Sequence, residues 1–365
     1  MRRLKDNMKK KQNRIIVFGI PTYNEANNIK KLVKKIDEVA IELDETIVII
    51  NADNNSVDGT ANIFKKINTS NEKISINTWG VGKGRNIKTI FERTLEIPDC
   101  LGCVLIDGDI ESFSKEWFSA YINAIKKGFD FILPVYSRNY NEGNTTNHFI
   151  YPLLYSKMGS QSIKQGIAGD FGCSIDFIRY IVKHCIWHQY SLGYGVDIFL
   201  TLNALHENLS ILEIDLDKKI HAPSFNKMYD MFLEVASSYY ETSKQLKNKN
   251  KVIKAEINNL KKKQIFLNPE KPILIDQILN LRNRAEHSFS DLSFISKPSA
   301  ENWLNRLVSN ESKLDFYESN LLANQLLPYF IVRVCEYLSV IKEADEAKKE
   351  LKKYEQIIDN LKTIK

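Results

Sequence analysis

The sequence predicts an α/β domain with a largely parallel sheet, followed by a helical region. From Arg14 to about Ser224, short apolar runs alternate with amphipathic stretches, a pattern typical of strands that alternate with helices. Three of the strand-to-helix junctions carry polar or glycine-rich loops. Because open α/β sheets bind ligands at the carboxyl ends of their strands, we expect a binding site at these loops.

Four apolar runs are the expected strands, and the first three are each followed by an expected helix. The strands cover residues 15–20, 46–51, 74–78 and 102–106. The segment 24–28 starts the first helix, which has the apolar face Ile29, Leu32, Val33 and Ile36. The helices after the second and third strands run through Ile67 and Leu95.

Composition and charge indicate an ordinary globular protein, with 365 residues, 43% of them hydrophobic and 26% charged, and a net charge of +6. Seven Lys and Arg residues lie in residues 1–14, which we expect to form a basic disordered tail rather than an arm for lipid or nucleic acid. No apolar core of the required length follows this tail, so we expect no secretion signal here. The five cysteines form no zinc pattern, and we expect a reduced, cytoplasmic protein.

The remainder, residues 226–365, is expected to be helical, with helices in 244–263, 272–285, 300–340 and 342–363. No apolar run reaches the roughly 20 residues that span a bilayer. The longest candidate, 326–340, contains Arg333 and Glu336, so we expect a buried helix there. Charges of both signs alternate in 342–365, which favours a helical cap or a homodimer arm over nucleic-acid binding.

The most informative motif is Asp107-Gly108-Asp109 at the end of the fourth expected strand. In an extended backbone residues two apart point to the same side, so both carboxylates can face one ligand. Such oxygens suit a divalent cation that substrate phosphates also hold. An acidic turn after a strand is the alternative interpretation.

Three further loops follow the other expected strands. In Pro21-Thr22-Tyr23-Asn24-Glu25 the aromatic ring and carboxylate can bind a nucleobase, or Asn24 can cap the next helix, and both can hold. Residues 53–60 have turn chemistry. Gly82-Lys83-Gly84 offers backbone N–H groups and a cation to a diphosphate, although its spacing is not that of a P-loop.

These four motifs, in this order, resemble the nucleotide-sugar half of GT-A glycosyltransferases. Segments 165–172, 193–197 and 215–221 resemble the glucosyl-3-phosphoglycerate and mannosylglycerate synthases, which are retaining enzymes with small acceptors. The resemblance covers about residues 15–225. It implies a Rossmann-like GT-A domain over 15–225, with the helical region 226–365 as a cap or oligomerisation element.

The resemblance also implies roles for single residues. Asp109 and His221 would coordinate Mg²⁺ or Mn²⁺ bridging the donor diphosphate. Tyr194, Asp197 and Lys83 would form the catalytic group, in which Asp197 either orients sugar hydroxyls or acts as a nucleophile. Donor contacts would come from Pro21, Thr22, Tyr23, Glu25, Asn54, Lys83, Asp107, Gly108 and Ile167.

The acceptor side departs from the family pattern. Where the family has a Gly-Arg-Val-Thr run, this chain has Gly143, Asn144, Thr145 and Thr146. After His221 come Ala222, Pro223 and Ser224 rather than a polar or basic pair. An anionic acceptor calls for a cation with bidentate geometry, and Arg138 is the candidate substitute.

The resemblance therefore implies a metal-dependent retaining transferase. It would move a hexose from a nucleotide-diphosphate sugar, UDP-glucose before GDP-mannose, to a glycerate, phosphoglycerate, glycoside or similar small polar acceptor. Two alternatives stay open. One is an inverting family-2-type enzyme that builds polysaccharide or lipid-linked sugar, and the other is a non-catalytic sugar-nucleotide-binding module.

Overall fold

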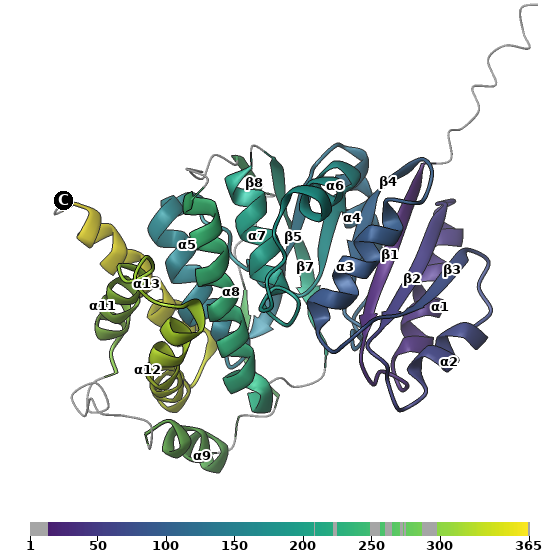
Figure 1. The fold of residues 1–365 in the computed structure, drawn as a ribbon. Helices are drawn as coiled ribbons and strands as arrows, with labels where there is room; N and C mark the ends of the chain where they lie inside the picture. Colours follow the sequence, from purple (N-terminus) through teal and green to yellow (C-terminus); the bar gives the residue numbers. More distant parts are fainter. Residues whose placement is uncertain are drawn as a thin grey trace, which may run out of the picture. The chain divides into compact units, whose positions relative to one another are not determined.

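The computed structural model describes residues 14–207, 209–221, 225–248, 256–259, 265–270, 273, 275–286 and 298–363. The chain forms two compact units (Figure 1). The first contains Met1–Ile132 and Gly169–Cys185, and the second Leu133–Ala168 and Ile186–Lys365. The tail expected over 1–14 lies outside the described residues, except for Arg14.

The first unit is built on a mostly parallel sheet with the strand order β3-β2-β1-β4-β6. Strands β1, β2, β3 and β4 are parallel neighbours, whereas β6 runs antiparallel to β4. Their bounds are β1 Ile15–Thr22, β2 Ile47–Asp53, β3 Glu72–Asn77, β4 Cys100–Leu105 and β6 Phe171–Ser174. The four strands expected from the sequence are confirmed. Their near-continuous apolar sequences fit strands buried on both faces.

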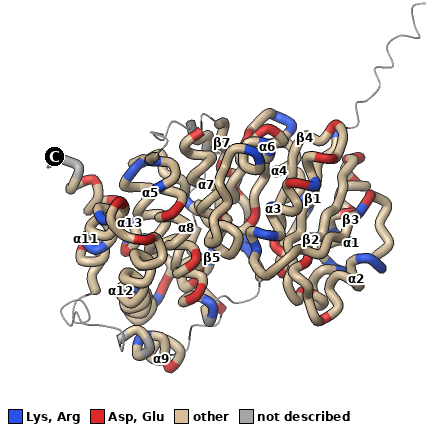
Figure 2. The backbone as a smooth tube through the Cα atoms, viewed as in Figure 1, with Lys and Arg blue, Asp and Glu red and all other residues tan. Residues whose placement is uncertain are grey.

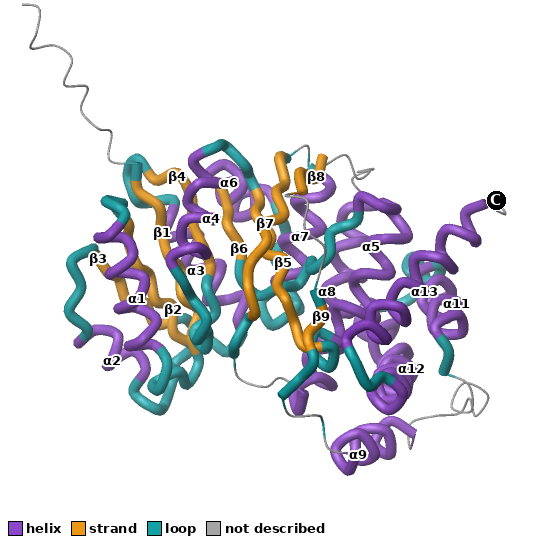
Figure 3. Tube along the Cα trace, turned by 180° about the vertical axis from the view of Figure 1, so that it is seen from behind, coloured by secondary structure: helices purple, strands orange, loops and turns teal. Residues whose placement is uncertain are grey.

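Helices cover both faces of this sheet (Figures 1 and 3). Helix α1 packs on α4 and α2, while α3 packs on α6. The predicted apolar face of α1 is buried, including Ile29, Leu32, Val33 and Ile36. The helices are α1 Ile29–Glu42, α2 Thr60–Lys66, α3 Lys83–Thr94, α4 Lys115–Lys126 and α6 Ile175–His184. Each parallel strand therefore ends in a loop that leads into a helix, as the motif positions predict.

Strand β5 (Phe131–Asn139) starts in the first unit and continues into the second. Phe131 and Ile132 pair with β6 in the first unit. In the second unit, β5 neighbours β7 (Ser210–Lys218), which pairs in parallel with β8 (Glu256–Asn259). The short strand β9 (Phe266–Leu267) pairs in parallel with the end of β5. Figure 3 shows the helices beside these strands.

The second unit is rich in helices, and its core combines the regions before and after residue 225. Helix α8 packs on α7 and α12, and α13 packs on α5 and α11. Its helical elements are η1 Thr146–Ile150, a π-helix, α5 Tyr151–Met158, η2 Gly159–Gln161, α7 Val196–His206, η3 Phe225–Lys227, α8 Met228–Asn248, α9 Ile275–Glu286, α11 Ala300–Glu311, α12 Ser319–Val340 and α13 Ala344–Thr363. The second unit thus contains residues from both sides of the domain boundary expected at 225/226.

The helical region follows the sequence expectations with one correction. Helix α9 lies in the stretch expected over 272–285, and α11 and α12 divide the stretch 300–340. The helix expected over 244–263 is wrong at residues 256–259, which form β8. There Ile257 pairs with Ile211 of β7, so an available strand edge outweighs the local helical pattern.

Three further expectations can be compared with the structure. In its described residues, no helix is long and apolar enough to cross a membrane. The buried helix expected over 326–340 is confirmed as part of α12. Along α13 Lys residues alternate with Asp and Glu, so no basic stripe forms on this helix (Figure 2).

Candidate functional site

The loop after β1 is tied to the loop after β2 by buried polar groups. The Thr22 hydroxyl donates to Asp53 Oδ1 at 2.9 Å and accepts from Asn51 Nδ2 at 2.8 Å. Asp53 also accepts from the backbone N–H and the hydroxyl of Ser56. Thr22, placed in the predicted donor site, therefore uses its hydroxyl inside the protein, while Tyr23 beside it is half exposed.

Asn24 is not the helix cap that one interpretation of the sequence predicts. Its φ is +60°, in the left-handed region, and α1 begins only at Ile29. Its side-chain oxygen accepts instead from the Val57 backbone N–H, and its own N–H donates to Ser56 Oγ at 2.7 Å. Asparagine tolerates this backbone and bonds locally, so it favours a turn here over a helix start.

Asn54 fixes the glycine-rich loop before α3. Its side-chain Nδ2 donates to the Gly80 carbonyl at 3.1 Å and to Asn86 Oδ1 at 2.7 Å, and its Oδ1 accepts from the Gly82 N–H at 3.0 Å. Gly82, the residue before α3, has a φ of +143° that favours glycine. Asn54 therefore holds the loop from which Lys83 projects.

Lys83 and Asp107 form an ion pair at the carboxyl end of the sheet. The Lys83 Nζ lies 2.7 Å from Asp107 Oδ1 and donates to the Gly169 carbonyl at 3.1 Å. The Asp107 backbone N–H donates to the carboxylate of fully buried Asp170 at 2.8 Å. Segment 169–170 thus joins two of the predicted motifs within the first unit.

Gly108 brings a third motif into the same place. A Cβ at this position would lie 2.9 Å from Thr22 Cγ2 and 3.1 Å from Glu25 Cγ. The loop after β1 can approach the loop after β4 this closely only because residue 108 has no side chain. The first unit therefore gathers Thr22, Glu25, Lys83, Asp107 and Gly108 at one edge of its sheet, as the donor prediction requires.

The second unit holds two buried cations on one carbonyl oxygen. Arg138 Nε donates to Gln165 Oε1 at 2.9 Å and its Nη2 to the Ala168 carbonyl. Lys219 Nζ donates to the same Ala168 carbonyl at 2.8 Å. Ile167, predicted to contact the donor, precedes this shared carbonyl in the chain. Arg138 and Lys219 therefore place two positive charges beside segment 165–168.

The predicted acceptor residues 143–146 form a buried turn at the start of η1. Gly143 has a φ of +64°, and Arg138 Cδ lies 3.6 Å from the place of a Cβ on it. The Gly143 carbonyl accepts from the Asn147 N–H at 2.8 Å. Arg138 and Gly143, two predicted acceptor contacts, are thus neighbours in the second unit.

The loop carrying Tyr194 and Asp197 rests on α8. The Tyr194 N–H donates to Glu234 Oε2 at 2.6 Å, and Ser238 Oγ donates to the Gly195 carbonyl at 2.7 Å. A Cβ on Gly195 would lie 2.3 Å from Ser238 Cβ. The helix therefore fixes the backbone from which half-exposed Tyr194 and buried Asp197 project.

The predicted metal ligands lie in different units, Asp109 in the first and His221 in the second. Within the described part of the chain, no three His, Cys, Asp or Glu side chains gather in a way that could hold a metal ion alone. A carboxylate and an imidazole are suitable donors for Mn²⁺ or Mg²⁺.

Asp170 and Lys219 lie within segments 165–172 and 215–221, which carry the family resemblance, but the sequence analysis assigns no role to either residue. Both are buried beside predicted site residues. The available signal is only their membership of these segments. Ala222, Pro223 and Ser224, which follow His221, lie outside the described residues.

Residues 18–185 match the family described as glycosyl transferase family 2. This part of the chain is a glycosyltransferase domain. Tyr194, Asp197 and His221 lie beyond the matched residues. No curated protein matches the chain.

The fold is similar to solved structures of glucosyl-3-phosphoglycerate synthase from Mycobacterium tuberculosis. The complex with Mn²⁺, UDP-glucose and phosphoglyceric acid has 18% identity and a TM-score of 0.50, covering 63% of this chain and 79% of that chain. The complex with Mg²⁺ and UDP has 17% identity and a TM-score of 0.49, with the same coverage. At this identity the likeness shows the fold, and it confirms the GT-A architecture of the glycosyltransferase domain.

Proposed function

We propose that the protein is a divalent-cation-dependent retaining glycosyltransferase that moves a hexose from a UDP-sugar to a small polar acceptor. The observation that carries the proposal is the Lys83–Asp107 pair beside Gly108 and Glu25, where three strand-end loops meet. A cation, backbone N–H groups at the start of α3 and carboxylates occur together there. These groups match the diphosphate, ribose and base of a nucleotide sugar.

The chemistry requires stabilisation of the leaving group. Breaking the anomeric bond leaves a nucleoside diphosphate with additional negative charge, which preorganised positive groups stabilise. Asp107 and the Gly169 carbonyl hold the Lys83 ammonium in place before the donor arrives. Lys83 then contributes without reorganising at the moment of bond cleavage.

A divalent cation bound by Asp109 and His221 would supply further charge neutralisation at the diphosphate. Support comes from the donor chemistry of the two side chains and from the similar structure of glucosyl-3-phosphoglycerate synthase, which contains Mn²⁺ together with UDP-glucose. In this proposal Asp109 binds the cation, while Asp107 addresses the nucleoside and Lys83.

Tyr194 and Asp197 would face the transferred sugar. Their loop is fixed on α8 by Glu234 and Ser238, which suits groups that orient sugar hydroxyls. We assign this orienting role to Asp197, so retention would follow from front-face attack assisted by the departing phosphate. Arg138 with Lys219 would offer charge to an acidic acceptor at the turn 143–146.

An inverting family-2-type enzyme is the second candidate, because the matched residues 18–185 contain the four loop motifs that both types share. The anomeric configuration of the product, read by NMR, separates the two. A retained configuration supports the proposal, and an inverted one overturns its stereochemistry. A non-catalytic binding module would bind donor without turnover across an acceptor panel. The cytoplasmic location remains a prediction.

Donor binding can be tested directly by thermal shift with UDP-glucose and GDP-mannose, each with Mn²⁺, Mg²⁺ or EDTA, since a ligand that binds only the folded state raises the Tm. Trp79 provides a second readout, because it is 93% exposed on the loop that Asn54 holds. Quenching of its fluorescence by the donor, absent in Trp79→Phe, would support the site. A Tm unchanged by every nucleotide sugar would contradict the proposal.

A further inference from the structure

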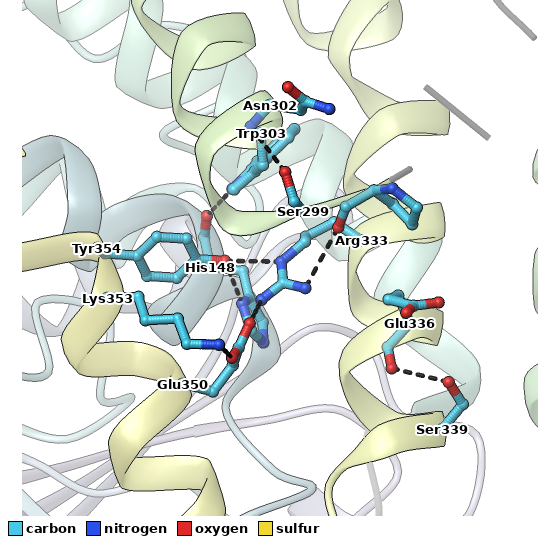
Figure 4. A network of polar contacts seen from close by, with 11 residues as sticks. His148, Ser299, Asn302, Trp303, Arg333, Glu336, Ser339, Glu350, Lys353 and Tyr354 are labelled. Carbon is cyan, nitrogen blue, oxygen red and sulfur yellow. Dashed lines mark hydrogen bonds and ion pairs between the residues drawn. The ribbon is translucent and has the colours of Figure 1, made fainter. Parts of the chain in front are cut away.

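Three C-terminal helices hold the segment that contains the predicted acceptor turn. Tyr337 of α12 donates its hydroxyl to the Tyr140 carbonyl at 2.9 Å. Trp303 of α11 donates Nε1–H to the His148 carbonyl at 2.5 Å, and Tyr354 of α13 bonds His148 Nδ1 at 2.8 Å. Figure 4 shows Trp303, Tyr354 and Arg333 around His148. The contacts lie on both sides of residues 143–146.

The hydrogen bonds in this network have one consistent direction. Arg333 Nε donates to the Tyr354 hydroxyl at 3.1 Å, so the Tyr354 proton is available for His148 Nδ1. Burial and the Arg333 charge both lower the pKa of His148, which keeps its ring neutral and its Nδ1 able to accept. The chain from Arg333 to His148 is therefore ordered.

A carboxylate anchors the buried arginine. Arg333 is only 2% exposed and its Nη2 donates to Glu350 Oε1 at 2.6 Å. Burial raises the pKa of Glu350, but hydrogen bonding from Lys353 and the charge of Arg333 outweigh it, so this pKa lies below its ordinary value. The sequence pattern treats Arg333 as a polar interruption in an apolar helix, yet its guanidinium bonds both Tyr354 and Glu350 of α13.

Hydrogen bonds also connect α13 to α5, the helix that follows η1. Tyr151 donates to Glu355 at 2.5 Å and Tyr155 donates to Asp359 at 2.9 Å. The two tyrosines are four residues apart, as are the two carboxylates, so the two contacts lie on successive turns of α5 and α13. The buried apolar residues of α13, Ala347, Leu351, Tyr354 and Ile358, are used within the same unit. This apolar face is therefore buried within the unit, and homodimerisation through the helical region stays a prediction.

The held segment includes an unusual local structure. Residues Thr146–Ile150 form a π-helix, which is rare and frequently occurs at functional sites. Asn147 Nδ2 donates to the Glu142 carbonyl at 3.2 Å, closing the turn that contains Gly143. A turn fixed in this way loses little conformational freedom when a ligand binds.

We propose that α11, α12 and α13 form an internal scaffold that presents residues 143–146 to the acceptor. Trp303, Tyr337 and Tyr354 are then positioning residues for acceptor recognition. The inference rests on the proposed function, because it takes residues 143–146 as the acceptor turn. It gives the C-terminal helices a defined role in the glycosyltransferase.

The test uses the full-length chain and the variant Tyr354→Phe, which removes only the hydroxyl between Arg333 and His148. Tyr240→Phe is the matched control, because its buried hydroxyl has no hydrogen-bond partner among the described residues. Two quantities are measured. One is amide hydrogen exchange across 140–150 by mass spectrometry, and the other is the KM for acceptor and for donor, together with UDP release in the absence of acceptor.

In Tyr354→Phe we expect exchange across 140–150 to rise about tenfold and the acceptor KM to rise severalfold, because a buried partner loses its hydrogen bond. The donor KM and acceptor-independent UDP release should stay as in wild type, and Tyr240→Phe should change none of these quantities. Tyr337→Phe, which loses the bond to Tyr140, should repeat the pattern.

Three outcomes would count against the account. Unchanged exchange in both variants overturns the scaffold. Raised exchange with equal changes in donor and acceptor KM, or with neither, overturns the role in acceptor recognition. Absence of transfer by the wild-type protein overturns the proposed function and, with it, the acceptor role. The difference in amide hydrogen exchange between wild type and the two variants then decides by itself whether the helices act as a scaffold.

Discussion

The ammonium of Lys83 lies 2.7 Å from the carboxylate of Asp107, joining the first residue of α3 to the loop after β4. Both side chains are largely shielded from water, so the pair is screened less than one on the open surface. The contact joins the glycine-rich loop to the acidic turn. It gives the candidate donor site a positive group with a defined position.

Lys83→Ala should lower the rate of glycosyl transfer about 10²- to 10³-fold, the loss typical when one preorganised charge-stabilising group is removed. Steady-state kinetics with UDP-glucose measures this. Lys88→Ala is the matched control, since Lys88 lies on the same helix and pairs only at the surface with Glu92. Equal activity in the two variants would remove Lys83 from the catalytic group.

Gly108→Ala should weaken donor binding about tenfold or more, because the new methyl group would come within 2.9 Å of Thr22 and push the loop after β1 away. Isothermal titration with UDP and Mn²⁺ measures the Kd. Gly128→Ala serves as the control. It places a side chain at a φ of +88° with no atom within 4 Å, so it costs stability without touching the site. A normal Kd for Gly108→Ala would show that the loop contact does not shape the donor site.

Acid should destabilise the second unit through His188. Burial lowers its pKa to about 4, with a smaller opposing effect of Glu241. Its Nδ1 accepts from the Ser191 N–H, and its Nε2 bonds Thr242. As the pH falls, the unfolded chain binds a proton first, so this stabilisation is complete above about pH 6.5 and is lost toward pH 4, by about 1.4 kcal/mol per pH unit.

Urea unfolding between pH 7 and pH 5 measures this loss. His188→Gln should reduce the pH dependence, whereas His184→Gln, at an exposed position on α6, should leave it unchanged. An identical pH dependence in wild type and His188→Gln would contradict the assignment of the acid sensitivity to His188.

The first unit could be predicted well from sequence because its signals are local. Apolar runs gave β1 to β4, and the turn residues after them marked the edge where Gly108, Lys83 and Asp107 meet. Asn24 was less predictable. A cap and a left-handed turn use the same residue types, and only contact with Ser56 and Val57 decides between them.

The second unit depends more on partners that are distant in sequence. Residues 256–259 form a strand because β7 offers an edge, which no helical periodicity reveals. Arg333 is buried because Glu350, seventeen residues later, and Tyr354 satisfy it. Asp170 and Lys219 likewise gain importance from contacts with Asp107 and Ala168 that the fold creates.

The most direct test of the central claim is release of UDP from UDP-glucose by the purified protein with an acceptor panel, in Mn²⁺ and in EDTA, for the wild type and for Asp109→Ala. We predict metal-dependent release by the wild type, with glucose transferred in the retained configuration, and release at least 10²-fold slower for Asp109→Ala. Equal release in EDTA, or a fully active Asp109→Ala variant, would contradict a metal-dependent glycosyltransferase with Asp109 as its ligand.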